Sequence, residues 1–392
     1  MRWPRDEVLT LKTSAVTTPR QYLAAADGLN RTNTLRRIDT PSLFRPTPPR
    51  KIMDTPAAIQ DAPLPKPIMS FYPPHKTDLD GTMCFFLLKN GGEGKVIAAD
   101  HTGRSVLYDL GLHAIRAMPS MKAPKCMPVS LTVRNRLYVL DRIPSLPDGR
   151  EQQSFEVLTF RQPRYDYGDW RWRSLDVPPY LSEPTCGPSG SGHMQSYDLV
   201  AGSNICISTG GVGSYSFDTK KRVWSKSGDW ALPFSGLAEY VPEHKLWFGM
   251  SSLDRGRAFC ASDLAAATAV TPPLVHGVWE DATPPIEGDL LVSYAVHLGG
   301  GKFCIVRFLE VGTCERLLMD FDTVETIVVF TGVEVERCGG VLHAVQHKSV
   351  RYKLADNHII HWVFQRTILL LGYPYYVGYY VGCEQIVSFL KC

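Results

Sequence analysis

The sequence lacks the short motifs that identify the commonest catalytic and metal sites. Its ten cysteines include no Cys-x-x-Cys pair, which argues against a zinc ribbon or a thioredoxin-type site. It has no Gly-Lys-Ser/Thr loop, and the glycine pairs that start at Gly92, Gly211 and Gly299 lack the third glycine of a dinucleotide-binding fingerprint. No apolar secretory segment opens the chain, so we expect the cytoplasm or the nucleus and no disulfide framework.

Excess positive charge is confined to the N-terminal segment. Residues 1–66 contain 11 Lys and Arg against 6 Asp and Glu, whereas the rest of the chain contains 31 against 33. A nucleic-acid-binding domain needs a basic face, and the near-neutral remainder does not predict one. We therefore expect no nucleic-acid partner.

Regular secondary structure is hard to place in this N-terminal segment. Eight of the 29 prolines lie between residues 41 and 67, where they exclude a long helix or a central strand. The sequence predicts a mostly disordered leader over residues 1–66, with one short strand near Leu35–Ile38. Removal of this leader is expected to leave the melting temperature unchanged. An organelle transit peptide is the alternative, and Asp6 and Glu7 count against it.

Short apolar runs separated by glycine, asparagine and aspartate follow over residues 67–364. The runs Lys95–Asp100 and Arg104–Asp109 flank a His-Thr-Gly turn and predict a hairpin. Anchor residues recur every 44 to 57 positions, at Tyr108, Phe160, Phe217, Ser262, Phe308 and Tyr352. Four-stranded repeats of about 40–50 residues are typical of β-propellers. We predict an all-β fold, a β-propeller of about six four-stranded units, or blades.

The clearest repeat unit runs from Gly210 to Trp224. The pair Gly210-Gly211 follows one strand, Phe217-Asp218 ends the next, and Trp224 opens a third. Glycine suits the turn because it adopts positive φ without strain, and an aspartate there can accept backbone N–H bonds. In its order of residues this unit resembles a kelch repeat.

A second run, Gly228-Asp-Trp230-Ala-Leu-Pro-Phe234, extends the likeness. It resembles a large kelch-like family of plants, expanded in the cereals, that carries only a domain-of-unknown-function label. The resemblance covers about residues 67–364 and implies a kelch-like, galactose-oxidase-like propeller. It brings no established activity and no catalytic residue with it, and we expect no cofactor.

Candidate catalytic and metal-binding residues are weak throughout the chain. His343-x-x-x-His347 and His358-x-x-His361 are the closest histidine pairs, and neither has an evident third ligand. The serines of residues 188–192 lack the spacing and the strand-to-helix context of a nucleophile elbow. The tryptophans are better explained by packing between blades than by an aromatic binding surface.

The C-terminal segment, residues 365–392, is apolar and rich in tyrosine and glycine. From Thr367 to Cys383 it has no charged residue, yet its glycines and Pro374 disfavour a membrane-spanning helix. Three interpretations stay open: an added strand, a poorly ordered terminus and, least favoured, a membrane anchor.

With no catalytic constellation, the sequence predicts a monomeric, non-enzymatic protein-binding module whose partner it does not identify. The predicted contact is the polar, aromatic loop at residues 162–169, through Arg164, Tyr165, Tyr167 and the adjoining Trp170. The alternative is an enzyme that acts on a sugar or another small molecule in the central pocket of the propeller. Three or more titratable side chains converging at that centre would favour the enzyme.

Overall fold

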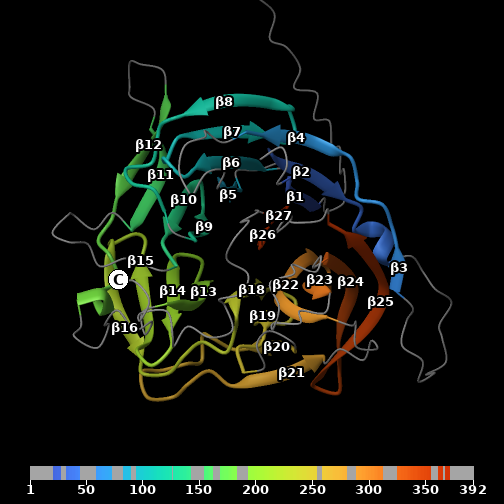
Figure 1. The fold of residues 1–392 in the computed structure, drawn as a ribbon. Coiled ribbons are helices and arrows are strands. Elements are labelled where there is room, and N and C mark those ends of the chain that lie inside the picture. The colour runs from blue at the N-terminus through green and yellow to red at the C-terminus, as the bar shows by residue number, and fades with distance from the viewer. Residues whose placement is uncertain are drawn as a thin grey trace, which may run out of the picture.

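The computed structural model describes most of the chain as β-structure around a common centre (Figure 1). The residues it describes are 21–27, 32–44, 59–72, 83–89, 94–125, 127–142, 154–161, 168–182, 193–253, 258–279, 288–311, 325–354, 361–364 and 367–370. Within them the helical elements are two short 3-10 helices, η1 (Pro41–Phe44) and η2 (Pro179–Ser182).

Five sheets are each built mainly from four consecutive antiparallel strands. These strands are β5 (Met83–Leu88), β6 (Lys95–Asp100), β7 (Ser105–Asp109) and β8 (Ala114–Met118) in the first sheet; β9 (Val129–Val133), β10 (Arg136–Leu140), β11 (Phe155–Arg161) and β12 (Asp169–Ser174) in the second; β13 (Met194–Val200), β14 (Asn204–Thr209), β15 (Gly213–Asp218) and β16 (Val223–Gly228) in the third; β18 (Glu239–Val241), β19 (Leu246–Met250), β20 (Phe259–Ser262) and β21 (Val275–Trp279) in the fourth; and β22 (Asp289–Gly299), β23 (Lys302–Val311), β24 (Glu325–Cys338) and β25 (Val341–Lys353) in the fifth.

Short parallel strands widen two of these sheets. They are β17 (Gly236–Leu237), which pairs with β13, and β3 (Ile59–Asp61), which pairs with β25. The third and fifth sheets therefore have five strands, not the four expected.

A sixth sheet joins strands from the two ends of the chain. Its order is β26 (His361–Phe364), β27 (Thr367–Leu370), β1 (Gln21–Asp27), β2 (Thr32–Ile38) and β4 (Pro67–Phe71). β1 pairs with β27 in parallel, with Leu23 opposite Ile368, so the N-terminal and C-terminal strands share one sheet. β27 falls within the C-terminal segment, and residues 371–392 lie outside the described ranges.

The innermost strands of the six sheets meet in a ring. Contacts run from β5 to β9, then through β13, β18, β22 and β26 back to β5, and Figure 1 shows these strands nearest the centre. The outermost strands, such as β8, β12, β16 and β21, lie at the periphery. The fold is an all-β propeller.

Hydrophobic clusters fill the space between each sheet and the next. A twisted sheet has two apolar faces, and burying a side chain such as Phe contributes about 1.5–3 kcal/mol, so each sheet gains from a neighbour on both sides. Aromatic contacts between adjacent sheets join Phe155 to Phe217, Phe248 to Phe303 and Phe71 to Phe85, with ring centroids 5.0, 5.1 and 5.3 Å apart. The sixth sheet contributes Leu35 to the cluster with the first sheet and Ile38 to the cluster with the fifth.

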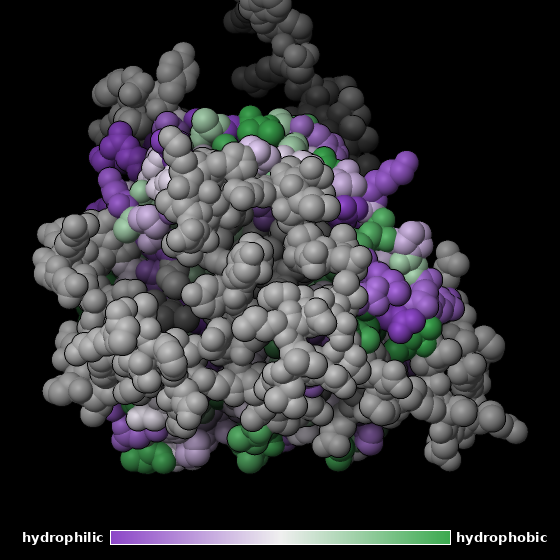
Figure 2. Space-filling view, viewed as in Figure 1, coloured by the Kyte–Doolittle hydropathy of each residue, from purple (hydrophilic) through white to green (hydrophobic). Residues whose placement is uncertain are grey.

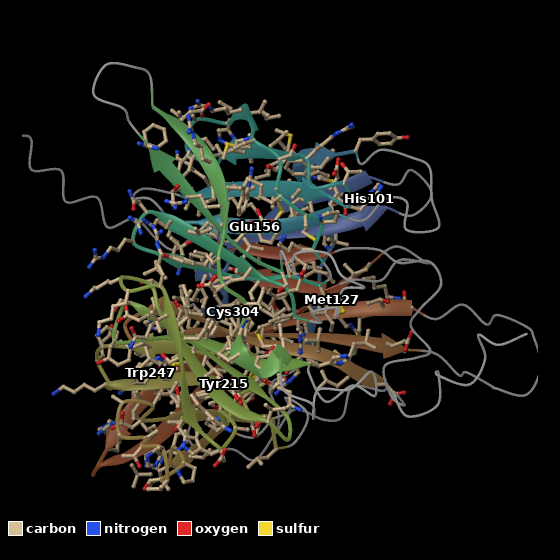
Figure 3. The ribbon with its side chains drawn as sticks, turned by 90° about the vertical axis from the view of Figure 1, so that its left-hand side faces the viewer. His101, Met127, Glu156, Tyr215, Trp247 and Cys304 are labelled. Atoms are coloured by element: carbon tan, nitrogen blue, oxygen red, sulfur yellow. The ribbon has the colours of Figure 1, made fainter. Side chains whose placement is uncertain are left out.

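A buried ion pair fixes the connection between the first and second sheets. The side chains of Lys125 and Glu156 are 1% and 0% exposed and pair directly. The backbone N–H groups of Lys122 and Ala123 also donate to the Glu156 carboxylate, at 2.9 and 3.2 Å. Because so many donors surround it, this buried charge is compensated. Figure 3 labels Glu156 within the ribbon.

The anchor residues are not distributed one to each sheet, as the sequence predicted. The first four anchors lie on the third strands of successive sheets, but Phe308 lies on β23 and Tyr352 on β25 of the same sheet. The four consecutive strands of that fifth sheet are 10 to 14 residues long, so one sheet spans the spacing of two expected units. Residues 83–354 therefore hold five sheets of consecutive strands, and the sixth sheet comes from the chain ends.

Part of the segment expected to be a disordered leader forms strands of the propeller. Residues 1–66 include β1, β2, η1 and β3, and the strand expected near Leu35–Ile38 is confirmed as β2. Asn33, Leu35 and Leu43 are buried. The prolines do not prevent this, because Pro41 starts a 3-10 helix and Pro63 and Pro65 lie between strands. The alternation of apolar residues over one isolated strand is a weak sequence pattern. The burial of these residues depends on packing against sheets that lie far away in the chain.

We expect Leu35→Ala to lower the free energy of unfolding by about 2–5 kcal/mol, since Leu35 is fully buried between the sixth and first sheets. Urea denaturation measures the change. The matched control is Arg37→Ala on the same strand, whose side chain is exposed and whose loss should cost less than about 0.5 kcal/mol. Equal stabilities for Leu35→Ala and the wild type would show that the sixth sheet does not close the ring.

Candidate functional site

Polar and titratable side chains gather where the inner strands end near the axis of the ring. They come from four different sheets and form what we call the axial cluster: Lys89, Asp198, Glu239, Glu243, His244 and His297. Lys89 directly follows β5, Asp198 lies on β13, Glu239 begins β18, and His297 lies near the end of β22. The ring of contacts between inner strands is what brings these distant positions together.

Glu239 is the centre of the cluster. Its Oε1 lies 3.9 Å from the Lys89 Nζ, although β5 and β18 belong to sheets that are not neighbours in the ring. Its Oε2 accepts the backbone N–H of His297 at 3.1 Å. The Lys89 side chain is 46% exposed and that of Glu239 is 18% exposed. Three sheets thus meet at one carboxylate that remains partly open to solvent.

The turn after β18 adds Glu243 and His244 to the cluster. Glu243 accepts the backbone N–H of Gly300 at 3.3 Å, which ties the fourth sheet to the fifth. Bonds from its own backbone amide and from that of Gly300 hold the pKa of the Glu243 carboxyl below its usual value. The backbone carbonyl of His244 accepts a bond from Arg337 at 3.2 Å. These bonds order the backbone of the turn.

Asp198 is the buried member of the cluster. It is 2% exposed, its Oδ1 accepts the backbone N–H of Leu199 at 2.5 Å, and its Oδ2 has no hydrogen-bond partner among the described residues. Burial raises the pKa of the Asp198 carboxyl well above its ordinary value, and the nearby Glu239 raises it further. A buried carboxyl of this kind is out of reach of a substrate.

Two further groups beside Asp198 are held in their neutral forms. Burial raises the pKa of Tyr197 to about 12 and that of the Cys206 thiol to about 11. Both therefore keep their protons at neutral pH. Neither supplies the phenolate or the thiolate that nucleophilic chemistry requires.

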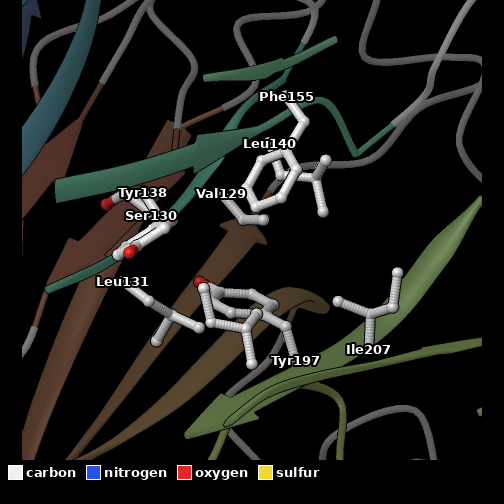
Figure 4. Close-up of a pocket in the computed structure, with 9 residues that line it drawn as sticks. Val129, Ser130, Leu131, Tyr138, Leu140, Phe155, Tyr197 and Ile207 are labelled. Atoms are coloured by element: carbon white, nitrogen blue, oxygen red, sulfur yellow. The ribbon is translucent and has the colours of Figure 1, made fainter. Parts of the chain in front are cut away.

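A small apolar hollow lies between the second and third sheets, close to the inner strands (Figure 4). The space in it that a water molecule could fill is only about 10 Å³. Its lining combines aliphatic and aromatic side chains: Val129, Ser130, Leu131, Tyr138, Leu140, Phe155, Tyr197, Ile205 and Ile207. In Figure 4 the Tyr197 ring lies across it. With so few polar groups, the hollow is a packing gap between two sheets.

The structure corrects one member of the predicted partner-binding loop. Trp170 is 7% exposed and packs edge-to-face on Phe160, with ring centroids 5.3 Å apart. It belongs to β12, where Trp170 and Trp172 turn inward and alternate with outward arginines, so it is a packing residue. Arg164, Tyr165 and Tyr167 lie outside the described residues.

The predicted repeat motif occupies the third sheet as the sequence indicated. Gly210 and Gly211 form the turn between β14 and β15, and Gly211 has φ of 75°. Phe217 is fully buried, and Asp218 accepts the backbone N–H groups of Lys220 and Lys221 at 2.8 and 3.0 Å. Trp224 packs on Phe217 at 5.0 Å between centroids. The motif is structural, because it builds two turns and one packing contact.

Trp230 links the third sheet to the fourth. Its Nε1 donates to the backbone carbonyl of Thr268 at 2.7 Å. Its indole lies across Gly228, where a Cβ would come within 2.1 Å of the ring. Leu232 and Phe234 then enter the core between these sheets. The Gly-Asp-Trp-Ala-Leu-Pro-Phe run is therefore a connector whose glycine makes room for the tryptophan.

The histidine pairs do not assemble a metal site in the described part of the chain. His343 and His347 lie on β25, and His347 Nε2 is 3.1 Å from a carboxylate oxygen of Glu334. Among the described residues no three His, Cys, Asp or Glu side chains are grouped so as to hold a metal ion. Within the same ranges, no helix is long and apolar enough to cross a membrane.

The family follows from the sequence comparison. A protein family described as "Protein of unknown function (DUF1668)" matches residues 18–352, which includes β1 and β2 as well as the five consecutive sheets. The chain belongs to the DUF1668 family. The DUF1668 match starts well before residue 67, in agreement with the N-terminal strands of the sixth sheet. No curated protein matches the chain.

Several solved structures are distantly similar to this DUF1668 chain. The β-propeller domain of Cps50 (Swd1) from Myceliophteria thermophila is 11% identical with a TM-score of 0.32, over 64% of this chain and 80% of that one. The allergen Mala s 1 of Malassezia sympodialis is 10% identical with a TM-score of 0.30, over 67% and 78%. The N-terminal domain of Nup159 is 10% identical with a TM-score of 0.28, over 85% and 75%. Likenesses of this strength carry no information on what the chain binds.

Sequence reasoning missed the axial cluster. Its members are isolated polar residues between position 89 and position 297, with no shared motif or spacing. The one local indication is the run of acidic and histidine residues around Glu239, Glu243 and His244 at a strand end. Only the closed ring brings Lys89 and Glu239 together.

We expect Asp198→Asn to stabilise the protein increasingly as pH rises. The pKa of Asp198 is higher folded than unfolded, so the wild type loses stability as pH rises from about 4 towards the folded pKa. The asparagine variant lacks this loss. Its melting temperature minus that of the wild type should grow as pH rises above about 4, the pKa of an unfolded aspartate.

Asp218→Asn is the matched control with the opposite sign. Backbone N–H bonds lower the pKa of the half-buried Asp218, so its carboxylate stabilises the fold above its unfolded pKa and this gain is lost as pH falls. A melting-temperature difference for Asp198→Asn that does not change with pH would contradict the environment assigned to Asp198.

Proposed function

We propose that this DUF1668 chain is a non-enzymatic, kelch-type protein-binding module that contacts its partner at the axial cluster. The observation that carries the proposal is the meeting of Lys89, Glu239 and His297 from three sheets at one partly exposed point. Tyr240, which follows Glu239 in β18, is 43% exposed and packs on Trp247 in a tilted arrangement, with ring centroids 4.6 Å apart. An exposed aromatic beside fixed charges is typical of protein contact sites.

The state of the charged groups favours binding over catalysis. Glu239 is held by Lys89 and by the His297 amide, and Glu243 is held by the Gly300 amide. Carboxylates fixed in this way present a rigid pattern of charge. The carboxyl whose pKa is raised, Asp198, is buried. A general acid must reach its substrate, which Asp198 does not.

An enzyme that acts on a sugar or another small molecule is the second candidate. The convergence of several titratable side chains at the axis is the observation that favours it. The two candidates differ in what Glu239 contacts. A small substrate would need the carboxylate itself, whereas a protein partner would also depend on Lys89 and Tyr240.

The experiment is affinity purification of the tagged chain, with quantitative mass spectrometry, as wild type and as the double variant Lys89→Glu/Tyr240→Ala. We expect the wild type to enrich specific proteins and the variant to lose them by roughly tenfold or more, because hot-spot side chains contribute at least about 2 kcal/mol each. Lys220→Glu, on the turn between β15 and β16, makes the same charge change away from the axis and should retain the partners.

Two outcomes would reject the proposal. If the axial variant and Lys220→Glu lose the same proteins, the axis is not the contact. If a panel of sugars contains a compound that raises the melting temperature of the wild type but not of Glu239→Gln, the enzyme is favoured instead.

Compartment and oligomeric state complete the proposal. We propose that the chain acts as a monomer in a reducing compartment such as the cytoplasm or the nucleus. The free thiols of Cys206, Cys304 and Cys338 support the choice of compartment.

A further inference from the structure

The chain itself shows how the outer edge of one of its sheets binds an extended segment through an aspartate. β3 is a three-residue strand that lies in parallel along the outermost full strand of the fifth sheet, β25, with Asp61 paired opposite Arg351. Both Asp61 carboxylate oxygens accept bonds from the Arg351 guanidinium, at 2.5 and 2.8 Å. Backbone pairing and a bidentate arginine–carboxylate ion pair therefore both hold β3 on this edge.

The outer edge of the second sheet has the same chemistry without a covering strand. β12 is the last strand of its sheet, and no described strand pairs with its outer side. Trp170 and Trp172 turn towards the first sheet, so Arg171 and Arg173 project from the opposite face and are exposed. Arg161 lies opposite Asp169 in the register of β11 and β12, and therefore on the same face as these two arginines.

Positive charge is in excess along this edge. The exposed charged residues of β8, β11 and β12 are four arginines and one aspartate, Asp169. Asp169 accepts a bond from Arg116 of β8 at 3.0 Å. Arg161, Arg171 and Arg173 form no ion pair among the described residues. Figure 2 shows hydrophilic side chains gathered over the meeting ends of β8 and β12, at the upper left.

The remaining uncovered edges are less suited to an acidic segment. On β16, Lys226 is already paired with Asp229 at 2.7 Å. β21 and β4 have no arginine or lysine, and β8 has Arg116 alone, which is engaged with Asp169. β12 is the described outer strand that combines unpaired backbone with two uncompensated arginines on one face.

We propose that β12 is a second contact surface, where an extended acidic segment of a partner protein adds as a further strand. Side chains two positions apart in a strand share a face, so the segment that fits Arg171 and Arg173 carries carboxylates at alternate positions. Its backbone pairs with the free edge of β12, as β3 pairs with β25. The surface is separate from the axial cluster, and the two proposals stand or fall independently.

The test measures binding of a fluorescent peptide of about eight residues, alternating glutamate and threonine, to the full chain. We expect saturable binding that weakens with salt, and that falls roughly tenfold in Arg171→Gln/Arg173→Gln. Hydrogen exchange should slow at the β12 amides when the peptide binds. A peptide with lysine in place of glutamate, and one with alternate backbone nitrogens methylated, should each bind at least about tenfold more weakly.

Arg136→Gln is the matched control, since Arg136 is an exposed arginine of the same sheet at the start of β10, not on its outer edge. It should bind as the wild type does. All three arginines are exposed, and unchanged melting temperatures check that the variants fold.

Several results would overturn the proposal. They are equal binding by the double variant and the wild type, undiminished binding of the methylated peptide, protection only outside β12, and no saturable binding up to about 1 mM. Tighter binding of an oligouridine would assign the arginines to nucleic acid instead. Self-association of the wild type that the double variant loses would make a second copy of the chain the occupant.

Discussion

The whole structure depends on the mutual coverage of neighbouring sheets. Each sheet is apolar on both faces, so it is stable only with a neighbour on each side, and a ring is the arrangement that gives every sheet two neighbours. The clusters between adjacent sheets are aromatic-rich, as in the contact of Phe155 with Phe217. The ring closes because a sixth sheet, formed by strands from both ends of the chain, lies between the fifth and the first sheets. Leu35, Ile38 and Phe71 supply the last two interfaces.

Closure of the ring also creates the axial cluster. Inner strands of six sheets contact one another in sequence around the axis, so side chains at their ends meet although they are far apart in the chain. Lys89 and Glu239 face each other across the ring. The surrounding bonds to the His297 and Gly300 amides hold the two partly exposed carboxylates in place. The proposed function rests on this charged centre and on the exposed Tyr240 that follows Glu239 in β18.

The periphery has a different chemistry from the axis. The outer strand of a sheet has unpaired backbone N–H and C=O groups along one side. Such an edge can pair with another chain and aggregate unless it is covered or has charged side chains. The chain covers β25 with β3 and secures it by pairing Arg351 with Asp61. β12 instead has exposed arginines, and these repel a second copy of the same edge while attracting an acidic strand. The same side chains therefore protect the edge from self-pairing and select its partner.

The sequence by itself determined the local structure. Alternating apolar residues, the Gly210-Gly211 turn, and the Phe217-Asp218 and Trp230 motifs act over a few residues, and each is found where the pattern placed it. The tertiary structure alone decided that Phe308 and Tyr352 share one sheet, that residues 32–44 close the ring, and that Trp170 is buried. The tertiary structure alone also decided the composition of the axial cluster. These features depend on contacts between segments that are distant in the chain, and the periodicity of a short stretch of sequence does not report such contacts.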